Sequence, residues 1–160
     1  MSDLLSIIKD TGDYSTQKFS KILGCSEDEI EKELEKLKTQ KILLGWMPIL
    51  NPSHENSSLV RAVIEVKISP EREGGFDRMA LRISKFDEVE SCYLMSGAYD
   101  LLVIVSGNNL KSVASFVSER LSTIQGVLST STHFLLRPYK EQGHILAGDN
   151  QHQGKPSVSP

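Results

Sequence analysis

The sequence is poor in cysteine and has no long apolar run. Cys25 and Cys92 lie far apart without CxxC spacing, so neither a disulfide framework nor a thiolate zinc site organises the fold, and a reducing cytoplasm is expected. The longest apolar run, residues 101–105, has the length of a buried strand and falls far short of the ~18 residues of a membrane helix. The first residues show no basic region ahead of an apolar stretch, so we expect no secretory signal.

Catalytic motifs are missing as well. The sequence contains no P-loop, no GxGxxG, no Ser-His-Asp arrangement and no paired carboxylates that argue for catalysis. The four histidines show no HxH, HxxxH or HExxH spacing, so neither a metal site nor a cofactor is expected. The sequence therefore predicts a protein that is not an enzyme.

Positive charge is in deficit at the start of the chain. The 160 residues have a formal net charge of −3. Residues 1–55 hold seven lysines and ten acidic residues, so the whole negative excess falls within the N-terminal third. This balance bears directly on any partner that carries phosphates.

The first 45 residues are typical of a helical domain. Apolar residues at positions 4, 5, 7 and 8 predict a first helix, and a second one carries Phe19, Ile22 and Leu23 at helical spacing before Gly24 ends it. Ser26 opens a third helix with Glu29 three residues later, which is the spacing of a capping box. A short glycine turn between two helices indicates a helix-turn-helix, although a three-helix module that binds no ligand would show the same pattern.

A connecting segment, residues 46–58, follows this domain. Pro48 and Pro52 cannot donate to a sheet ladder, so the apolar stretch around them is an edge strand or a connector, and the polar residues 53–58 are expected to form a loop. Trp46, the only tryptophan, is expected to pack where the connecting strand crosses a partner subunit.

Residues 59–140 predict a ferredoxin-like domain, so the fold class is α+β. Strand-type alternation over residues 60–68, helical spacing over 76–86, two strands up to residue 106, a helix over 110–124 and a last strand over 127–137 give the order β-α-β-β-α-β. Phe116 lies off the apolar stripe of the second helix, which suggests a subunit contact. Both faces of strand 101–105 are apolar, and no helix is left for the second face, so we predict a dimer formed sheet to sheet. Residues 141–160 are expected to be a largely disordered tail.

Several motifs in this order resemble the Lrp/AsnC family of feast/famine transcriptional regulators. They are Gly45-Trp46, Asn51-Pro52, Ser96-Gly97-Ala98-Tyr99-Asp100 between the second and third strands, and Gly126-Val127 before Thr130 and Thr132. The resemblance covers residues 3–140. It implies an N-terminal winged helix-turn-helix that binds double-stranded operator DNA, a homodimer that often assembles to an octamer, and an amino acid or related effector at the contact between dimers.

The resemblance places the third helix in the major groove, where phosphate contacts would come from Lys18, Lys21, Lys32, Lys36 and Lys38. The exposed positions of that helix hold more acids than lysines, and Glu33 and Glu35 stand where family members commonly carry basic residues. Two interpretations stay open. The helix reads DNA weakly, since a carboxylate accepts from cytosine N4, or it presents a solvated face of Glu–Lys pairs.

The candidate effector residues are Gly97, Tyr99, Asp100, Thr130 and Thr132. Gly97 permits close backbone approach, Asp100 is a partner for an α-amino group, and the two threonine hydroxyls are donors for an α-carboxylate. An ordinary hairpin with a turn-capping Asp and a Thr-bearing strand would look the same.

Two other functions remain as alternatives. One is an oligomeric metabolite sensor of the same fold that no longer binds DNA, for which the acidic third helix argues. The other is an enzyme similar to siroheme decarboxylases, which have this two-part architecture. Only His133 and His144 lie near the end of the domain, and no Arg-rich segment is present to hold tetrapyrrole carboxylates.

Overall fold

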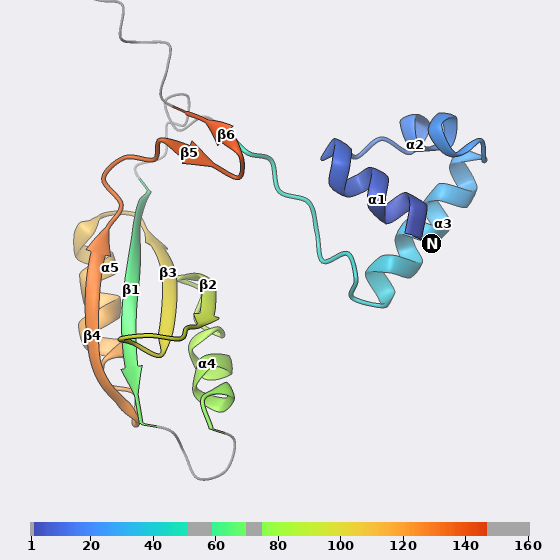
Figure 1. Ribbon diagram of the computed structural model, residues 1–160. Helices are drawn as coiled ribbons and strands as arrows, with labels where there is room; N and C mark the ends of the chain where they lie inside the picture. Colours follow the sequence, from blue (N-terminus) through green and yellow to red (C-terminus); the bar gives the residue numbers. More distant parts are fainter. Residues whose placement is uncertain (1, 51–58, 70–74, 147–160) are drawn as a thin grey trace, which may run out of the picture. The chain divides into compact units, whose positions relative to one another are not determined.

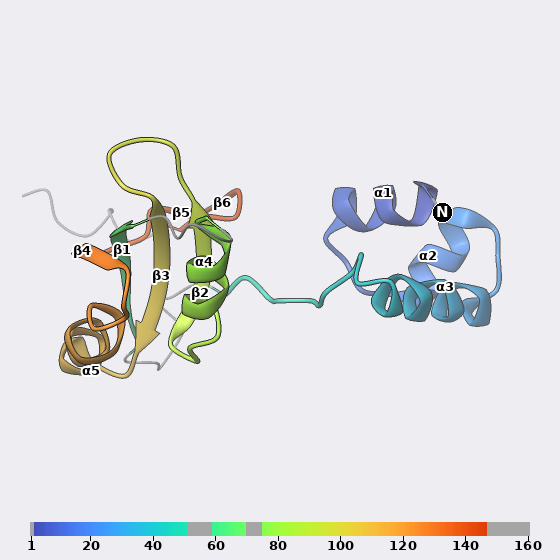
Figure 2. The same ribbon diagram turned by 90° about the horizontal axis from the view of Figure 1, so that it is seen from below.

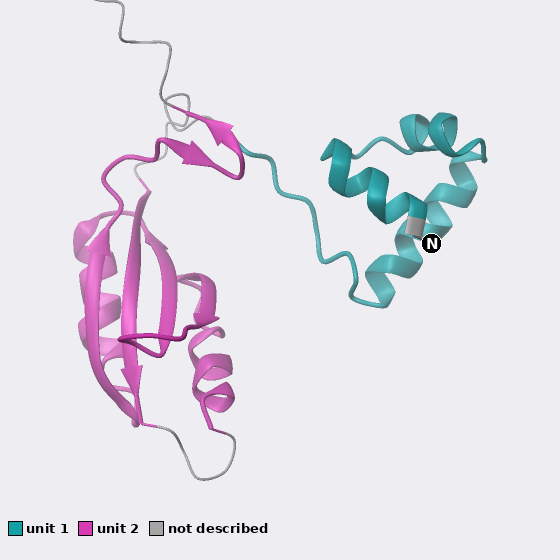
Figure 3. Ribbon diagram, viewed as in Figure 1, with its two compact units in different colours: residues 1–49 teal, residues 50–160 magenta. Residues whose placement is uncertain are grey.

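The chain divides into two units, residues 1–49 and 50–160 (Figure 3). The structure is a computed structural model, and it describes residues 2–50, 59–69 and 75–146 (Figure 1). The resemblance and the periodicities placed a helical domain first and an α+β domain second, and both are present.

Unit 1 consists of three helices, α1 (Ser2–Thr11), α2 (Thr16–Leu23) and α3 (Glu27–Thr39). They enclose a small core in which α2 contributes Phe19, fully buried, while Ile22 of the same helix is 53% exposed. The expected apolar stripe of α2 is therefore narrower than its sequence indicates, because Phe19 and Leu23, four residues apart, already fill the core-facing side. The buried core residues are Leu4, Ile8, Phe19, Ile30, Leu34 and Leu37.

Residues 43–50 form neither a helix nor a strand. The connecting strand expected from residue 46 is absent over residues 46–50, and residues 51–58 lie outside the described residues. Unit 1 likewise has no strand among its described residues that would form a wing. Trp46 packs on the core of its own unit, with its ring centroid 4.9 Å from that of Tyr14 in an edge-on arrangement.

Unit 2 contains the predicted β-α-β-β-α-β order. Its elements are β1 (Val60–Ile68), α4 (Asp77–Ile83), β2 (Val89–Leu94), β3 (Leu101–Gly107), α5 (Leu110–Ser115) continued by the π-helix η2 (Phe116–Leu121), and β4 (Val127–Phe134). The four strands form an antiparallel sheet in the order β2-β3-β1-β4, which is the ferredoxin-like arrangement.

Both helices of unit 2 cover the same face of this sheet. Every second residue of β1 and β3, such as Ile64 and Val103, is fully buried against Met79 and Ile83 of α4 and Leu121 of η2. In Figures 1 and 2, α5 lies on one side of the sheet and the β2–β3 loop on the other. The opposite face holds Val63, Leu102, Ile104 and Tyr93 with no helix over them.

The position of Phe116 contradicts one expectation. Phe116 is 3% exposed and packs in the core of unit 2, edge-on to Phe86 at 5.5 Å between ring centroids, so it is not a free subunit contact. Val113, Phe116 and Val117 are separated by three and four residues, so helical spacing places all three on the face that packs on the sheet. Leu110, at the start of the expected stripe, is 57% exposed.

The C-terminal region differs from the expected tail. Two short strands, β5 (Lys140–Glu141) and β6 (His144–Ile145), pair as a hairpin, and only residues 147–160 of the expected tail lie outside the described residues. The last main strand ends at Phe134, three residues earlier than predicted. None of the helices that the structure describes is long and apolar enough to cross a membrane.

Candidate functional site

The turn between α2 and α3 is built by three residues with defined roles. Gly24 adopts a left-handed conformation, φ +68°, and its N–H donates to Ser20 O. Ser26 caps α3: its hydroxyl accepts from Glu29 N, and the Glu29 carboxylate accepts from Ser26 N at 2.8 Å. The hydrogen bond from Ser26 N, and after it the one that the Ser26 hydroxyl donates to the Glu29 carboxylate at 3.0 Å, lower the pKa of Glu29. The result is a compact helix-turn-helix whose second helix has a fixed start.

The expected phosphate contacts are largely engaged by carboxylates. Lys36 Nζ lies 3.3 Å from Glu33, Lys38 Nζ lies 2.7 Å from Glu35, and Lys18 Nζ lies 2.8 Å from Asp13. The hydrogen bond to Glu35 raises the pKa of Lys38. The interpretation of α3 as a face of Glu–Lys pairs is therefore realised in the isolated chain.

Two of the five lysines remain without such a partner. Lys21 on α2 and Lys32 on α3 are exposed, and neither forms an ion pair with a described residue. Glu27, Asp28 and Glu29 occupy the first turn of α3, where carboxylates favour the helix dipole but repel phosphate. Lys36 and Lys38 can contact phosphates only by giving up their ion pairs with Glu33 and Glu35.

The β2–β3 loop, residues 95–100, is held by Asp100. Its carboxylate accepts a hydrogen bond from Ile68 N at 2.8 Å, its own N–H donates to Val66 O at 3.0 Å, and its carbonyl accepts from Met95 N. Gly97 is exposed and has φ +147°, a backbone conformation that residues with a side chain rarely adopt. Tyr99 beside Asp100 is half-buried. The Asp100 carboxylate thus closes the end of β1, which is the turn-capping role.

The two candidate threonines lie across β1 from this loop. Thr130 is paired with Val66 and Thr132 with Ile64, whose side chains are buried under the helices, so both threonines face the helix side at the edge strand. Thr130 Oγ1 lies 3.1 Å from Ser122 Oγ. Asp100 and Thr130 therefore lie on the two sides of β1 at the level of Val66. Strands two apart in a sheet are separated by roughly 10 Å.

The open sheet face carries charged pairs that sequence reasoning missed. Arg61 Nε lies 2.9 Å from Glu90, and His133 Nε2 lies 3.5 Å from Glu65. Ser131 Oγ lies 3.3 Å from the same His133 nitrogen, so serine and carboxylate share one ring atom and do not form a nucleophilic triad, which needs both nitrogens. Cross-strand register, invisible in the sequence alone, produces these pairs. Within the described residues, no three metal-ligating side chains gather.

The chain thus belongs to the class of two-unit proteins in which a capped helix-turn-helix precedes a βαββαβ unit. A family model described as the Lrp/AsnC ligand binding domain matches residues 61–145. The chain belongs to the Lrp/AsnC family.

Relatives support this assignment. The chain is 38% identical, over 93% of its length and 91% of the relative, to an uncharacterized HTH-type transcriptional regulator of Bacillus subtilis strain 168, YugG. Two solved structures have the same fold. One is a Neisseria meningitidis transcriptional regulator in complex with L-methionine (TM-score 0.60, 23% identity, 88% and 90% of the two chains). The other is a feast or famine regulatory protein from M. tuberculosis complexed with L-methionine (TM-score 0.64, 18% identity, 90% and 95%). The relatives are transcriptional regulators and not enzymes.

Proposed function

We propose that this protein is a transcriptional regulator that binds operator DNA through α2 and α3 and responds to an amino acid. The observation that carries the proposal is the helix-turn-helix with its Gly24 turn and complete Ser26 capping box, in a chain of the Lrp/AsnC family. Such a role requires access to DNA and therefore a cytoplasmic location.

DNA contact would come from the five lysines on α2 and α3. Lys21 and Lys32 are available without rearrangement, whereas Lys18, Lys36 and Lys38 must leave Asp13, Glu33 and Glu35. Each exchange leaves behind a carboxylate that needs a new counterion. The complex therefore releases fewer counterions on balance than five unpaired lysines would. We expect weak affinity and a shallow dependence on salt.

The test is a titration of duplex DNA, taken from fragments that the purified protein retains from its own genome, at low salt. We expect retention at micromolar protein, and Lys21→Gln/Lys32→Gln to lose most of it. The matched control, Lys9→Gln/Lys111→Gln, removes two exposed lysines elsewhere and should bind like the wild type. No retention of any fragment at micromolar protein would refute the DNA-binding function.

The effector would bind near the β2–β3 loop and β4, using Gly97, Tyr99, Asp100, Thr130 and Thr132. L-methionine is the first probe, because two solved relatives are complexed with it. Asp100 is already committed to Ile68 N, so its carboxylate has one oxygen left for an α-amino group. Thr130→Val/Thr132→Val should abolish the shift in melting temperature caused by the effector, with Ser129→Ala/Ser131→Ala on the opposite face of β4 as control.

Assembly would use the open sheet face. Val63, Leu102, Ile104 and Tyr93 are apolar or aromatic and stand on the side that α4 and α5 leave uncovered, so a second copy would bury them sheet to sheet. We propose a homodimer on this face and further assembly to an octamer. The substitution Ile104→Glu should give a monomer in sedimentation equilibrium. A wild-type protein that is itself monomeric would contradict the proposal.

A metabolite sensor that no longer binds DNA is the second candidate function. The Lys36–Glu33 and Lys38–Glu35 pairs favour it, because they neutralise the lysines that the reading helix would offer. An effector-dependent change of assembly without DNA retention is the result that would establish this alternative.

A further inference from the structure

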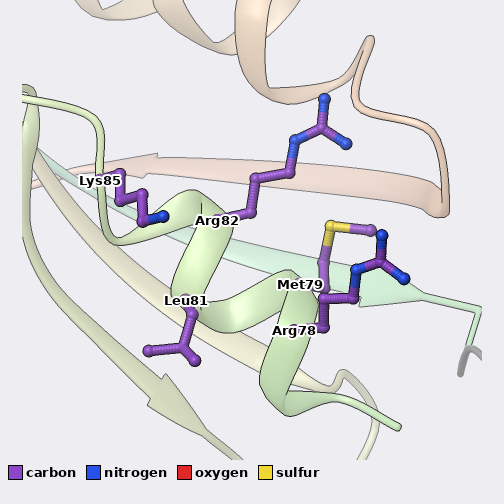
Figure 4. A pocket seen from close by; sticks show the side chains of 5 residues that line it. All are labelled: Arg78, Met79, Leu81, Arg82 and Lys85. Carbon is purple, nitrogen blue, oxygen red and sulfur yellow. The ribbon is translucent and has the colours of Figure 1, made fainter. Parts of the chain in front are cut away.

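Three basic side chains surround a pocket at α4 whose lining includes none of the candidate site residues described above. The pocket has a volume of about 460 Å³ and is lined by Arg78, Met79, Leu81, Arg82 and Lys85 (Figure 4). Arg78 and Arg82 are four residues apart and leave α4 on the same side, whereas Leu81 extends to the other side. Lys85 comes from the turn that follows α4.

The positive charge at this pocket is not balanced by its lining. No lining residue is acidic, and Arg82 and Lys85 form no ion pair with any residue that the structure describes. Two other arginines of unit 2 are matched: Arg61 pairs with Glu90, and Arg120 pairs with Glu88 while its guanidinium lies 4.7 Å from the Phe86 ring. The pocket thus brings three basic side chains together without an acidic residue in its lining.

These groups suit one ligand chemistry. Guanidinium forks bind phosphate oxygens with two parallel hydrogen bonds, and a lysine ammonium adds a point charge. Arg78 and Arg82 lie roughly 6 Å apart along α4 at about 1.5 Å per residue, a spacing that suits neighbouring phosphates, and Lys85 follows in the turn after the helix. A volume of about 460 Å³ falls within the range of small-molecule pockets.

We propose that the α4 pocket, lined by Arg78, Arg82 and Lys85, binds a small molecule that carries linked phosphate groups, such as a nucleoside triphosphate. The site shares no residue with the proposed amino-acid and DNA-binding residues, and the proposal does not depend on either of those functions. A DNA backbone is the less suitable occupant, because the cations line one short concave site and not an extended ridge.

The test uses equilibrium dialysis and isothermal titration of the full chain with inorganic tripolyphosphate, ATP and adenosine, all without divalent metal. We expect saturable binding of both phosphate compounds and none of adenosine. Arg82→Gln/Lys85→Gln should weaken binding at least tenfold. The control Lys111→Gln/Lys140→Gln removes the same charge from exposed positions in the same unit and should keep wild-type affinity.

Arg82→Lys keeps the charge but loses the planar fork, so it should show an intermediate affinity and provides a folded variant if the double substitution fails to fold. Equal weakening in the control pair would overturn the proposal by assigning binding to net charge. A lower melting temperature with unchanged affinity would overturn it too, because cations near the end of α4 would then serve only the helix carbonyls. Loss of duplex DNA binding in Arg82→Gln/Lys85→Gln, with tripolyphosphate affinity unchanged, would assign the surface to DNA instead.

Discussion

The lysines of α3 give the sharpest test of how this protein meets DNA. Lys36 and Lys38 are each held by a carboxylate three residues earlier in the same helix, Glu33 and Glu35. Replacing both acids, Glu33→Gln/Glu35→Gln, leaves side chains of the same shape without charge and frees both lysines. The fold should tolerate the change, because exposed pairs of this spacing contribute little to helix stability.

The expected gain follows from counterion release. Each phosphate neutralised steepens the slope of log affinity against log salt by about 0.9, so two freed lysines per reading helix add about 1.8. When salt rises from about 50 to about 200 mM, the variant should therefore lose roughly 12-fold more affinity than the wild type loses, or about 150-fold more when two helices engage DNA together. At the low-salt end, the variant should therefore bind duplex DNA markedly more tightly than the wild type.

The assay is fluorescence anisotropy of a labelled duplex over this salt range, with circular dichroism as a check of helix content. The control is Glu27→Gln/Glu31→Gln, which removes two acids of the same helix that form no ion pair with a described residue. The control should raise affinity through the general field without steepening the slope by the same amount. Identical salt slopes in the two variants would refute the reasoning that the ion pairs withhold Lys36 and Lys38 from DNA.

Three further perturbations probe local features of the fold. Gly126→Ala forces a side chain onto φ +97° and against the terminal methyl of a core methionine, and should lower the free energy of unfolding by about 1–3 kcal/mol in urea titration. Asp100→Ala leaves Ile68 N without its acceptor and should cost about 1–3 kcal/mol, whereas Asp100→Asn should cost less. Because the pKa of Glu29 is lowered from its ordinary value of 4.5, its carboxylate contributes fully to helix stability above that pH. The contribution is lost as the pH falls through the pKa of the folded state. Helix stability, measured by circular dichroism, should accordingly fall as the pH is lowered, and should fall less steeply in Glu29→Gln than in the wild type. Equal pH dependence in the two proteins would show that the Glu29 carboxyl does not cause the loss.

Much of the architecture could be predicted because it is written in local patterns. The Gly24 turn and the Ser26 capping box depend on residues within four positions of one another, and both form as expected. The order β-α-β-β-α-β follows from alternation and helical spacing, and the sheet order confirms it. Phe116 was misplaced although it follows Val113 by three residues, a spacing that puts the two on one helix face, and both are buried.

The candidate site was less accessible to such reasoning. Thr130 and Thr132 are two residues apart and therefore share one side of their strand, but only the pairing with β1 tells which side, and it is the helix side. The His133–Glu65 pair and the α4 pocket arise from residues that the sequence separates by whole elements or treats as plain surface. Charge pairing along α3 was foreseeable from spacing, yet its distances decide which lysines are engaged.

The position of β1 at the centre of the sheet has a consequence for synthesis. Its two neighbours are β3 and β4, and the register joins Ala62 to Phe134, so within the four-stranded sheet the first strand to be synthesised is completed by the last. Loop closure over that span is slow compared with local contacts. Until β4 emerges, one edge of β1 has unpaired amides and carbonyls, and a chain cut before residue 127 would keep that edge open to pairing with another chain.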